Sequence, residues 1–362
     1  MTVDPSGLKR MQVLAGGKGA AEPANPGPPI LEISTTGMET WSRCDRRYFY
    51  RYVRGLVPKA VNFNMQWGTL WHRVAQEYYR GLQNHASEDS AMHNAQLIAE
   101  RTTLIENKYH GDSELTLEVK DREALWDSWM YYYEKVACQD DWDEIVAVEE
   151  PIFLVVGVEG VPILKVRATL DLHVKKKGTR FIVDHKTTGE VQKNLAYLAL
   201  DIQMRTYPLA IKTYYDESPT LCYNMISRDV PPGYRHRPLF TESGRARSPE
   251  TLKSMQDVKK YLHREFIVYS DDQYRAFEVS LVKNALVLRA EQASANWPRR
   301  IVKMGGMACD GCPYFGPCTA EFDGQVVSDD NPAITMMFTK DPLVEPKRSV
   351  LLTGLPKNPF LP

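Results

Sequence analysis

The sequence predicts an α/β (α+β) protein in which a β-sheet core is flanked by helices and carries a helical cap. Residues 146–186 are rich in β-branched and apolar side chains and are interrupted by turn-forming stretches, which is typical of neighbouring strands. On both sides of this region apolar residues recur at helical spacing, which is typical of amphipathic helices. The order of helices, then strands, then helix and strand again favours one layered core.

Four helices are expected before the strands. Ser34 precedes Thr-Thr-Gly, which is typical of a helix N-cap, because a serine side chain can accept a hydrogen bond from a free backbone N–H group. Leu70, Val74 and Tyr78 are four residues apart and therefore lie on one stripe of a helix. The first helix is expected to run through residues 43–52, and the others to span 66–82, 88–108 and 119–138.

The central region predicts a three-stranded antiparallel meander. Its strands lie between residues 146 and 186, and Gly157–Gly160 and Lys177–Thr179 supply the turns. Beyond the meander the pattern returns to helical spacing, with one further β-branched run. The later elements are expected as helices at 194–215, 249–265 and 278–297 and as a strand at 220–226.

Composition divides the chain into five regions. Residues 21–29 contain four prolines and residues 330–362 contain six, so neither end is expected to bury a core. Short strands at 335–338 and 350–352 are the most regular structure expected of the last stretch. We expect a flexible leader at 1–29, an N-terminal helical region at 30–145, a central core at 146–230, a C-terminal helical region at 231–325 and a proline-rich tail at 326–362.

Overall charge limits how the protein can bind a polyanion. The chain has 45 basic and 46 acidic residues and a formal net charge of −1, so nucleic-acid binding would have to use local patches. No run approaches the roughly 20 apolar residues that a membrane-spanning helix needs, and the first residues lack the apolar core of a secretory signal. The sequence therefore favours a cytoplasmic protein with no membrane partner.

Two carboxylates and a lysine are expected to meet within the meander. Asp184 and Lys186 are two residues apart on a strand and point to one face, whereas His185 points to the other. Asp171, on the preceding strand, can approach Asp184 across the hairpin. Two carboxylates in a partly buried pocket repel each other, and Mg²⁺ or Mn²⁺ would remove that repulsion by binding both. Taken alone, the same residues could also form an exposed cross-strand ion pair.

Three further polar side chains could complete such a site. Gln203 and Tyr207 are four residues apart on a predicted helix and share one face, where they could hold a phosphate or a water molecule by hydrogen bonds. His72, near the start of its predicted helix, could be a further metal ligand. Each of the three, taken singly, is also compatible with ordinary helix packing.

Three cysteines cluster towards the C-terminal end of the chain. Cys309, Cys312 and Cys318 lie within ten positions, in a segment rich in glycine and proline that is typical of loops that wrap around metals. A fourth ligand must come from elsewhere, and Cys44 is the natural donor. Because cytosolic thiols stay reduced unless a metal or cluster binds them, the spacing predicts such a site.

In order and spacing, these motifs resemble those of the RecB-like branch of the PD-(D/E)XK nucleases, which includes nuclease domains of bacterial recombination machines and CRISPR-associated RecB-like exonucleases. The segment from Ser34 to Tyr50 is similar to that family's opening helix and its C-P-R-R-F stretch, with Asp45 in place of the usual proline. A second departure is Ala168, where a glycine is often found three residues before the first catalytic aspartate. The residues that carry the resemblance are His72, Asp171, Asp184, Lys186, Gln203 and Tyr207.

The resemblance implies a restriction-endonuclease-like mixed sheet with the PD-(D/E)XK core at residues 146–230. The metal ligands that it implies for Mg²⁺ or Mn²⁺ are His72, Asp171 and Asp184. It also implies that Lys186 is the catalytic lysine and that Gln203 and Tyr207 support it.

The resemblance also implies an iron-sulfur clasp. In such nucleases one distant cysteine and a C-terminal C-x₂-C-x₅-C hold a [4Fe-4S] cluster, which here would tie the first helix to the last. Structural zinc is the alternative, although zinc sites usually draw two close C-x-x-C pairs and this chain has one. The implied cluster ligands are Cys44, Cys309, Cys312 and Cys318.

The implied function is a metal-dependent DNA exonuclease that hydrolyses phosphodiester bonds in single-stranded DNA or at DNA ends, in recombination, repair or replication. The chain has no helicase P-loop motif, so any unwinding would belong to a recombination, helicase or CRISPR-integration partner. The alternative is a nucleic-acid-binding scaffold that does not cleave and is stabilised by a zinc or iron-sulfur site. Arginines interleaved with aromatic residues suit a single strand, and the expected DNA contacts are Arg43, Arg46, Arg47, Tyr48 and Arg51.

Overall fold

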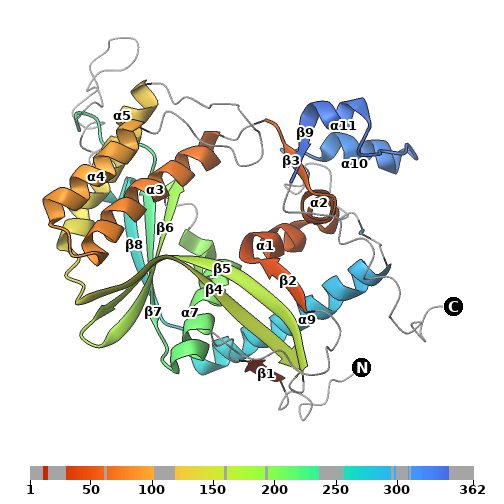
Figure 1. Cartoon of the computed structure of the whole chain (residues 1–362), viewed down its shortest axis with the longest axis horizontal. Coiled ribbons are helices and arrows are strands. Elements are labelled where there is room, and N and C mark those ends of the chain that lie inside the picture. The colour runs from red at the N-terminus through yellow and green to blue at the C-terminus, as the bar shows by residue number, and fades with distance from the viewer. Residues whose placement is uncertain are drawn as a thin grey trace.

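A mixed sheet of seven strands forms the centre of the computed structural model (Figure 1). The structure describes residues 11–14, 30–60, 63–101, 119–158, 161–191, 195–235, 253, 257–294, 297–298, 309 and 311–341. The strands are β1 (Met11–Leu14), β2 (Leu31–Ser34), β4 (Glu144–Val158), β5 (Val161–Lys176), β6 (Thr179–Thr188), β7 (Thr220–Ser227) and β8 (Leu262–Ile267). Their order is β1-β4-β5-β6-β7-β8, and β2 pairs with β5.

The meander predicted at residues 146–186 is confirmed. β4, β5 and β6 are consecutive antiparallel strands, whereas β2 runs parallel to β5 and β7 runs parallel to β6. Lys177 and Gly178 form the turn between β5 and β6, and both have positive φ, at 49° and 77°. A two-residue turn of this kind fixes the register of the hairpin. It therefore decides which residues of β6 lie opposite Asp171.

Helices cover both faces of the sheet (Figure 1). Ile182 and Leu221 belong to one hydrophobic core and Val183 and Cys222 to another, as expected when successive side chains point to opposite faces. The first core contains side chains of α1, α7 and α9, and the second contains those of α3, α4 and α5. The helices are α1 (Thr35–Arg43), α2 (Asp45–Tyr48), α3 (Phe63–Gln83), α4 (Glu88–Arg101), α5 (Val119–Lys135), α7 (Ile202–Tyr215), α9 (Asp271–Ser294), α10 (Phe315–Phe322) and α11 (Pro332–Met337). This arrangement confirms the predicted α/β (α+β) class.

The opening helix starts as predicted but is interrupted. The Oγ atom of Ser34 caps α1 and accepts a hydrogen bond from the backbone N–H of Gly37 at 3.0 Å. Cys44 has an extended backbone, with φ −165° and ψ 117°, and separates α1 from α2. A π-helical turn at Phe49–Val53 then follows α2. The prediction of one continuous helix through residues 43–52 is therefore wrong at Cys44.

The helix predicted at residues 194–215 is divided in two. A 3₁₀-helix at Leu195–Leu200 is followed by Asp201, whose backbone is extended. The Asp201 carboxylate caps α7 and accepts hydrogen bonds from the backbone N–H groups of Gln203, at 2.7 Å, and Met204, at 3.1 Å. An N-capping aspartate favours a helix start at this point. It fixes Gln203 in the first turn of α7.

Three further predictions need correction. The helix predicted at 249–265 is wrong at its C-terminal end, because Leu262 begins β8, which pairs with β7. The strand predicted at 335–338 is wrong, since α11 covers residues up to Met337 and a strand begins only at Phe338. Part of the predicted leader, Met11–Leu14, forms β1 on β4, whereas the strand predicted at 350–352 lies outside the described residues.

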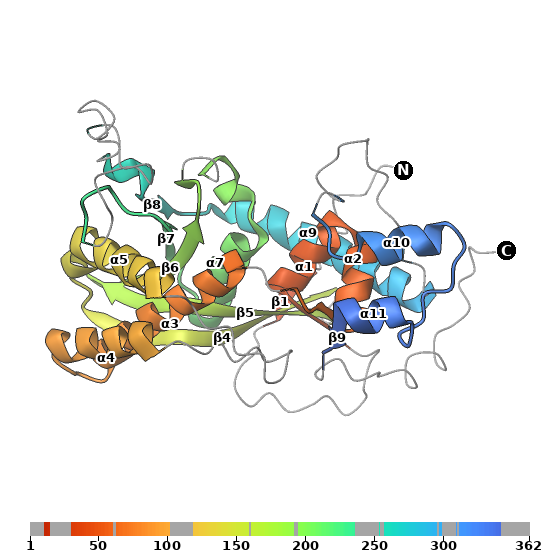
Figure 2. The same ribbon diagram turned by 90° about the horizontal axis from the view of Figure 1, so that it is seen from above.

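The N-terminal and C-terminal parts of the chain meet in a separate small unit. β3 (Leu56–Pro58) and β9 (Phe338–Lys340) form a two-stranded antiparallel sheet. The Tyr314 ring stacks between the rings of Tyr50, at 5.4 Å, and Phe338, at 5.3 Å. Figures 1 and 2 place α10 and α11 beside α2, at the opposite end of the molecule from α4. We call this unit the clasp.

Ion pairs inside the clasp tie α10 to the opening helices. The Glu321 carboxylate accepts hydrogen bonds from the Tyr50 hydroxyl, at 2.6 Å, from Arg54, at 3.2 Å, and from Arg46. Arg54 also binds Asp329, at 2.5 Å, and Arg51 binds Asp341, at 2.9 Å. The Glu321 side chain is only 14% exposed, so water screens these charges weakly.

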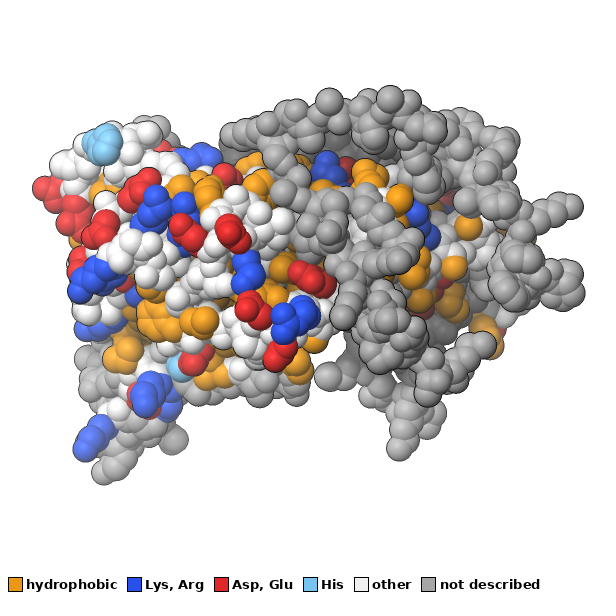
Figure 3. Space-filling model, turned by 90° about the horizontal axis from the view of Figure 1, so that it is seen from below, with side chains coloured by type: hydrophobic (Ala, Val, Ile, Leu, Met, Phe, Trp, Pro, Cys, Tyr) orange, Lys and Arg blue, Asp and Glu red, His pale blue; other side chains and the backbone are white. Residues whose placement is uncertain are grey.

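Charges of both signs are mixed over the described surface drawn in Figure 3. This agrees with the formal net charge of −1 and with the absence of any overall attraction for a polyanion. Within the described ranges, we find no helix with the length and apolar character needed to cross a membrane.

Substituting Glu321 should destabilise the clasp. Glu321→Ala removes the acceptor shared by two arginines and a tyrosine. Arg46 and Arg54 would stay largely buried but would lack this carboxylate. Breaking one partner of a buried ion pair costs about 3 kcal/mol of unfolding free energy. Urea denaturation should detect this loss, with Glu217→Ala, which removes a half-exposed partner of Arg180, as the control. Equal effects of the two substitutions would contradict a structural role for Glu321.

Candidate metal centre

Asp171 and Asp184 lie where the ladder between β5 and β6 ends. The ladder runs from Lys176 and Thr179 to Leu172 and Val183, and the two aspartates are the next residue on each strand. Along β5, Leu170 belongs to the first hydrophobic core and Leu172 to the second. The two aspartates therefore lie where the pairing of β5 with β6 ends and where the two hydrophobic cores adjoin.

The Asp171 carboxylate is held between a backbone N–H group and an imidazole. It accepts a hydrogen bond from the His185 N–H at 2.7 Å, and the same Oδ2 atom lies 3.5 Å from Nδ1 of His72. Burial raises the pKa of Asp171, but His72, the contact with His185 and the charge of Lys186 together hold it below its usual value. Asp171 is thus an anion at neutral pH.

Asp184 is completely buried beside the same site. Lys186 Nζ approaches its Oδ1 atom at 3.4 Å, whereas its buried Oδ2 atom has no hydrogen-bond partner. Burial raises the pKa of Asp184 well above the ordinary value, and the negative charge of Asp171 raises it further. Burial lowers the pKa of Lys186, but the two carboxylates outweigh it and raise that pKa above its usual value.

A chain of hydrogen bonds fixes Lys186. Its Nζ atom donates to Gln203 Oε1 at 2.9 Å, the Gln203 amide donates to the Tyr207 hydroxyl, and that hydroxyl donates to the Thr169 carbonyl oxygen at 2.6 Å. The predicted shared face of Gln203 and Tyr207 is present. Tyr207 is fully buried, so it holds Gln203 in place and offers no surface to a ligand.

His72 comes from α3, which packs against β4, β5 and β6. It is the tenth residue of that helix, so the prediction that it lies near the helix start is wrong. A Cβ atom on Gly68 would lie 2.8 Å from the Thr187 hydroxyl, so glycine lets α3 approach β6 closely one turn before His72. Burial lowers the pKa of His72, which favours the neutral imidazole that a metal needs. His185 points to the other face as predicted, where its Nε2 atom lies 3.0 Å from the Tyr132 hydroxyl.

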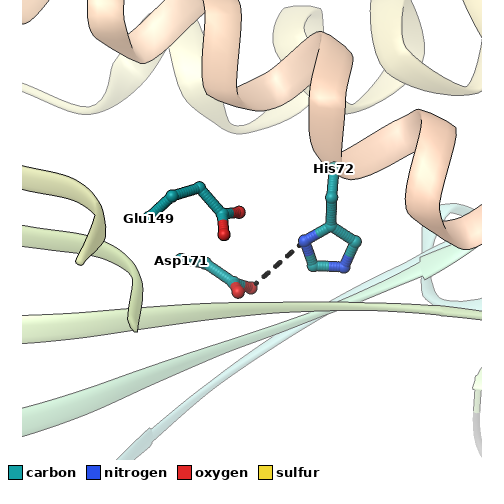
Figure 4. A group of neighbouring side chains, drawn as sticks. All are labelled: His72, Glu149 and Asp171. Carbon is teal, nitrogen blue, oxygen red and sulfur yellow. Dashed lines mark ion pairs between the residues drawn. The ribbon is translucent and has the colours of Figure 1, made fainter. Parts of the chain in front are cut away.

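Glu149 is a site residue that the sequence did not reveal. Ligand atoms of Glu149, Asp171 and His72 all lie within 4.8 Å of one another, and Figure 4 shows the three side chains converging. Burial, and then the charge of Asp171, raise the pKa of Glu149 to about 7. The only signal in the sequence is the pair Glu149 and Glu150 within an otherwise apolar strand.

The site opens into a cleft of about 740 Å³ that is lined by residues of α3 and of strands β4, β5 and β6. Oxygen and imidazole ligands of this kind suit Mg²⁺, Mn²⁺ and similar divalent cations. The unpartnered Oδ2 atom of Asp184 is also consistent with a bound cation, because a buried carboxylate oxygen normally has a partner. Residues that line the cleft include Gly68, His72, Arg73, Glu149, Asp171 and Lys186.

The four predicted cluster cysteines lie in the clasp or next to it. Cys44 separates α1 from α2, and Cys318 lies on α10. The Cys312 thiol is close enough to Cys44 and Cys309 for their charges to raise its pKa, although burial raises it more. All four thiols are partly exposed and none forms a disulfide. The structure therefore places Cys312 near Cys44 and Cys309, and the shared site of all four cysteines stays a prediction.

The predicted DNA contacts lie in different environments. Tyr48 is buried, 5.6 Å from the ring of Trp297, so it presents no surface to a nucleic acid. Arg46 and Arg51 bind Glu321 and Asp341 inside the clasp. Arg43 pairs with Glu39 on the surface, with 65% of its side chain exposed, and Arg47 is half-buried near Cys312. Three of these five residues thus have structural roles.

Comparisons with known proteins identify the fold family. The profile of the PD-(D/E)XK nuclease superfamily matches residues 32–319. A crystal structure described as a "Putative exonuclease" from Eubacterium rectale is similar with a TM-score of 0.39 and 11% identity, over 75% of this chain and 89% of that one. No curated protein matches this chain.

Removing the charge of Asp184 should stabilise the metal-free protein. The pKa of Asp184 is raised in the folded protein, so the folded state holds its proton more tightly than the unfolded state does. The free energy of unfolding therefore falls as the pH rises above 3.8. Asp184→Asn removes this loss and should raise the free energy of unfolding at neutral pH by at least about 1 kcal/mol. Urea denaturation with a chelator present measures this. The gain should shrink as the pH is lowered, and a less stable variant at neutral pH would show instead that the ion pair with Lys186 dominates.

Proposed function

The chain belongs to the PD-(D/E)XK nuclease superfamily, and from this premise we propose that it is a DNA exonuclease that depends on a divalent metal. The observation that carries the proposal is the meeting of Asp171, Asp184 and Lys186 at one end of the β5–β6 hairpin, with a buried carboxylate oxygen that has no partner. Phosphodiester bonds in single-stranded DNA or at DNA ends are the proposed substrate.

Asp171, Asp184 and His72 are the proposed ligands of Mg²⁺ or Mn²⁺. When bound, such a cation polarises a phosphate oxygen and lowers the pKa of a bound water. The protein holds the ligands ready, because the His185 N–H orients Asp171 and burial keeps His72 neutral. Asp171 and His72 line the cleft, which gives a phosphate access to them.

Lys186 is the proposed catalytic lysine. Its pKa is raised, so it remains a cation at neutral pH and can stabilise negative charge that develops on the phosphate. Gln203 and Tyr207 position it through the hydrogen bonds that end at the Thr169 carbonyl. We therefore assign Gln203 and Tyr207 as positioning residues, and not as groups that touch the substrate.

The proposed path of the DNA strand runs along the cleft. Arg73 lines the cleft next to His72, and Arg43 is exposed on α1. Local basic residues of this kind can bind phosphates even though the whole chain is nearly neutral. Of the contacts expected from the sequence, Arg43 and Arg47 remain the proposed ones. Arg46 and Arg51 are engaged in the clasp, and Tyr48 is buried in the first hydrophobic core.

We also propose that the clasp holds a [4Fe-4S] cluster through Cys44, Cys309, Cys312 and Cys318, with zinc as the alternative. The proximity of Cys312 to Cys44 and Cys309 supports this. A cluster here would place the chain in the RecB-like branch, whose members act in recombination or with helicase or CRISPR-integration partners. A scaffold that binds nucleic acid without cutting it is the competing function, and the intact Asp171, Asp184 and Lys186 favour the enzyme.

Activity should depend on Lys186 and on Mn²⁺. Lys186→Ala should lower the rate of digestion of end-labelled single-stranded DNA by at least about 100-fold, because it removes the cation beside the scissile phosphate. Lys175→Ala, which removes the lysine that pairs with Glu144 near the turn of the same hairpin, should digest at the wild-type rate. Wild-type protein that binds DNA but digests nothing in Mn²⁺ or Mg²⁺ would support the scaffold.

Anaerobic purification should yield a brown protein that contains iron and acid-labile sulfide. The Cys312→Ser variant should lose both and unfold more readily, since thiolate ligation contributes to folding. The Cys138→Ser variant, which alters an exposed cysteine outside the clasp, should keep them. Zinc without iron in the wild-type protein would identify the alternative site.

A further inference from the structure

Glu149 reaches the candidate metal centre by an unusual backbone conformation. In the ladder between β4 and β5, Val148 lies opposite Leu172 and Glu150 lies opposite Leu170, so Glu149 faces Asp171. Its φ of 53° lies in the left-handed region, which non-glycine residues adopt rarely within strands. Such strain persists only where the surrounding structure enforces it.

We propose that Glu149 is a ligand of the divalent cation at this centre, together with His72 and Asp171. The proposal rests on the metal-dependent activity proposed above, and it adds a third carboxylate to the ligands that the sequence indicated. Its basis is the geometry: one potential ligand atom from each of the three side chains lies within 4.8 Å of the other two (Figure 4).

A purely structural role does not account for this carboxylate. Among the described residues, the side chain of Glu149 forms no hydrogen bond and no ion pair, although it is half-buried and faces another anion. Arg80 and Lys186 are near enough to act on it electrostatically, yet neither is within ion-pair distance. Two facing carboxylates without a counterion repel each other, and a shared cation turns that repulsion into attraction.

A second observation at the same centre points to a ligand independently. The Oδ2 atom of Asp184 is completely buried and has no partner, and Asp184 is close enough to Asp171 for each charge to affect the other. An unsatisfied buried carboxylate oxygen is rare in a native protein. Glu149 and Asp184 are therefore both close enough to Asp171 for its charge to act on them.

The ligand chemistry also favours one class of cation. An imidazole together with carboxylates suits Mn²⁺ and other transition metals better than Mg²⁺ or Ca²⁺, which prefer oxygen ligands alone. His72 would thus make a centre that also contains Glu149 bind Mn²⁺ more tightly than Mg²⁺.

Calorimetric titration of the metal-free full-length protein with Mn²⁺ tests this assignment. The Glu149→Gln variant should bind Mn²⁺ about 10- to 100-fold more weakly than the wild type, in line with the loss of a supporting group at a metal site. The Glu150→Gln variant is the matched control, because Glu150 is the next residue of β4 and lies 3.7 Å from His173 instead. It should bind Mn²⁺ as the wild type does.

Thermal unfolding separates a lost ligand from a damaged fold. Without metal, Glu149→Gln should melt no lower than the wild type, because it removes a like charge next to Asp171, and its stabilisation by Mn²⁺ should be smaller. The assignment would be overturned if Glu149→Gln bound Mn²⁺ as tightly as the wild type, or if Glu149→Gln and Glu150→Gln lost the same affinity. In both cases the wild type would still bind Mn²⁺ and digest DNA. Wild-type protein that binds no Mn²⁺ would overturn the proposed function itself.

Discussion

Carboxylates that repel one another lie close together beside the β5–β6 pairing, and the surrounding fold holds them there. Asp184 is completely buried, Asp171 is nearly so, and Glu149 faces them from the next strand. Lys186 is the one cation that contacts any of the three, through Asp184, among the residues that the structure describes. Such an arrangement lowers the stability of the metal-free fold, as expected for a site selected for function.

The fold supplies the rigidity that this arrangement needs. A two-residue turn fixes the register of β5 and β6, and the hydrophobic cores on both faces of the sheet hold the strands where their pairing ends. Asp201 sets the start of α7, so Gln203 and Tyr207 can connect Lys186 to the backbone of β5. At the far end, the clasp joins segments that are separated by more than 250 residues in the sequence.

Local periodicity was sufficient to predict which of these side chains share a face, and non-local contacts explain what it missed. Asp184 and Lys186 share a face because successive side chains of a strand alternate between its two faces. Gln203 and Tyr207 meet because residues four apart lie on the same face of a helix. Glu149 could not be predicted, since it depends on a left-handed backbone residue and on the register across the hairpin. Likewise, the sequence could not show that Arg46 and Arg51 bind acids 275 and 290 positions away.

Anomalous X-ray diffraction from crystals soaked in Mn²⁺ would show whether Asp171 and Asp184 share one cation. We expect a Mn²⁺ peak within bonding distance, about 2.2 Å, of carboxylate oxygens of both Asp171 and Asp184. With that cation present, the Oδ2 atom of Asp184 would no longer lack a partner. Crystals saturated with Mn²⁺ that show no peak between these two side chains would rule out a cation shared by Asp171 and Asp184.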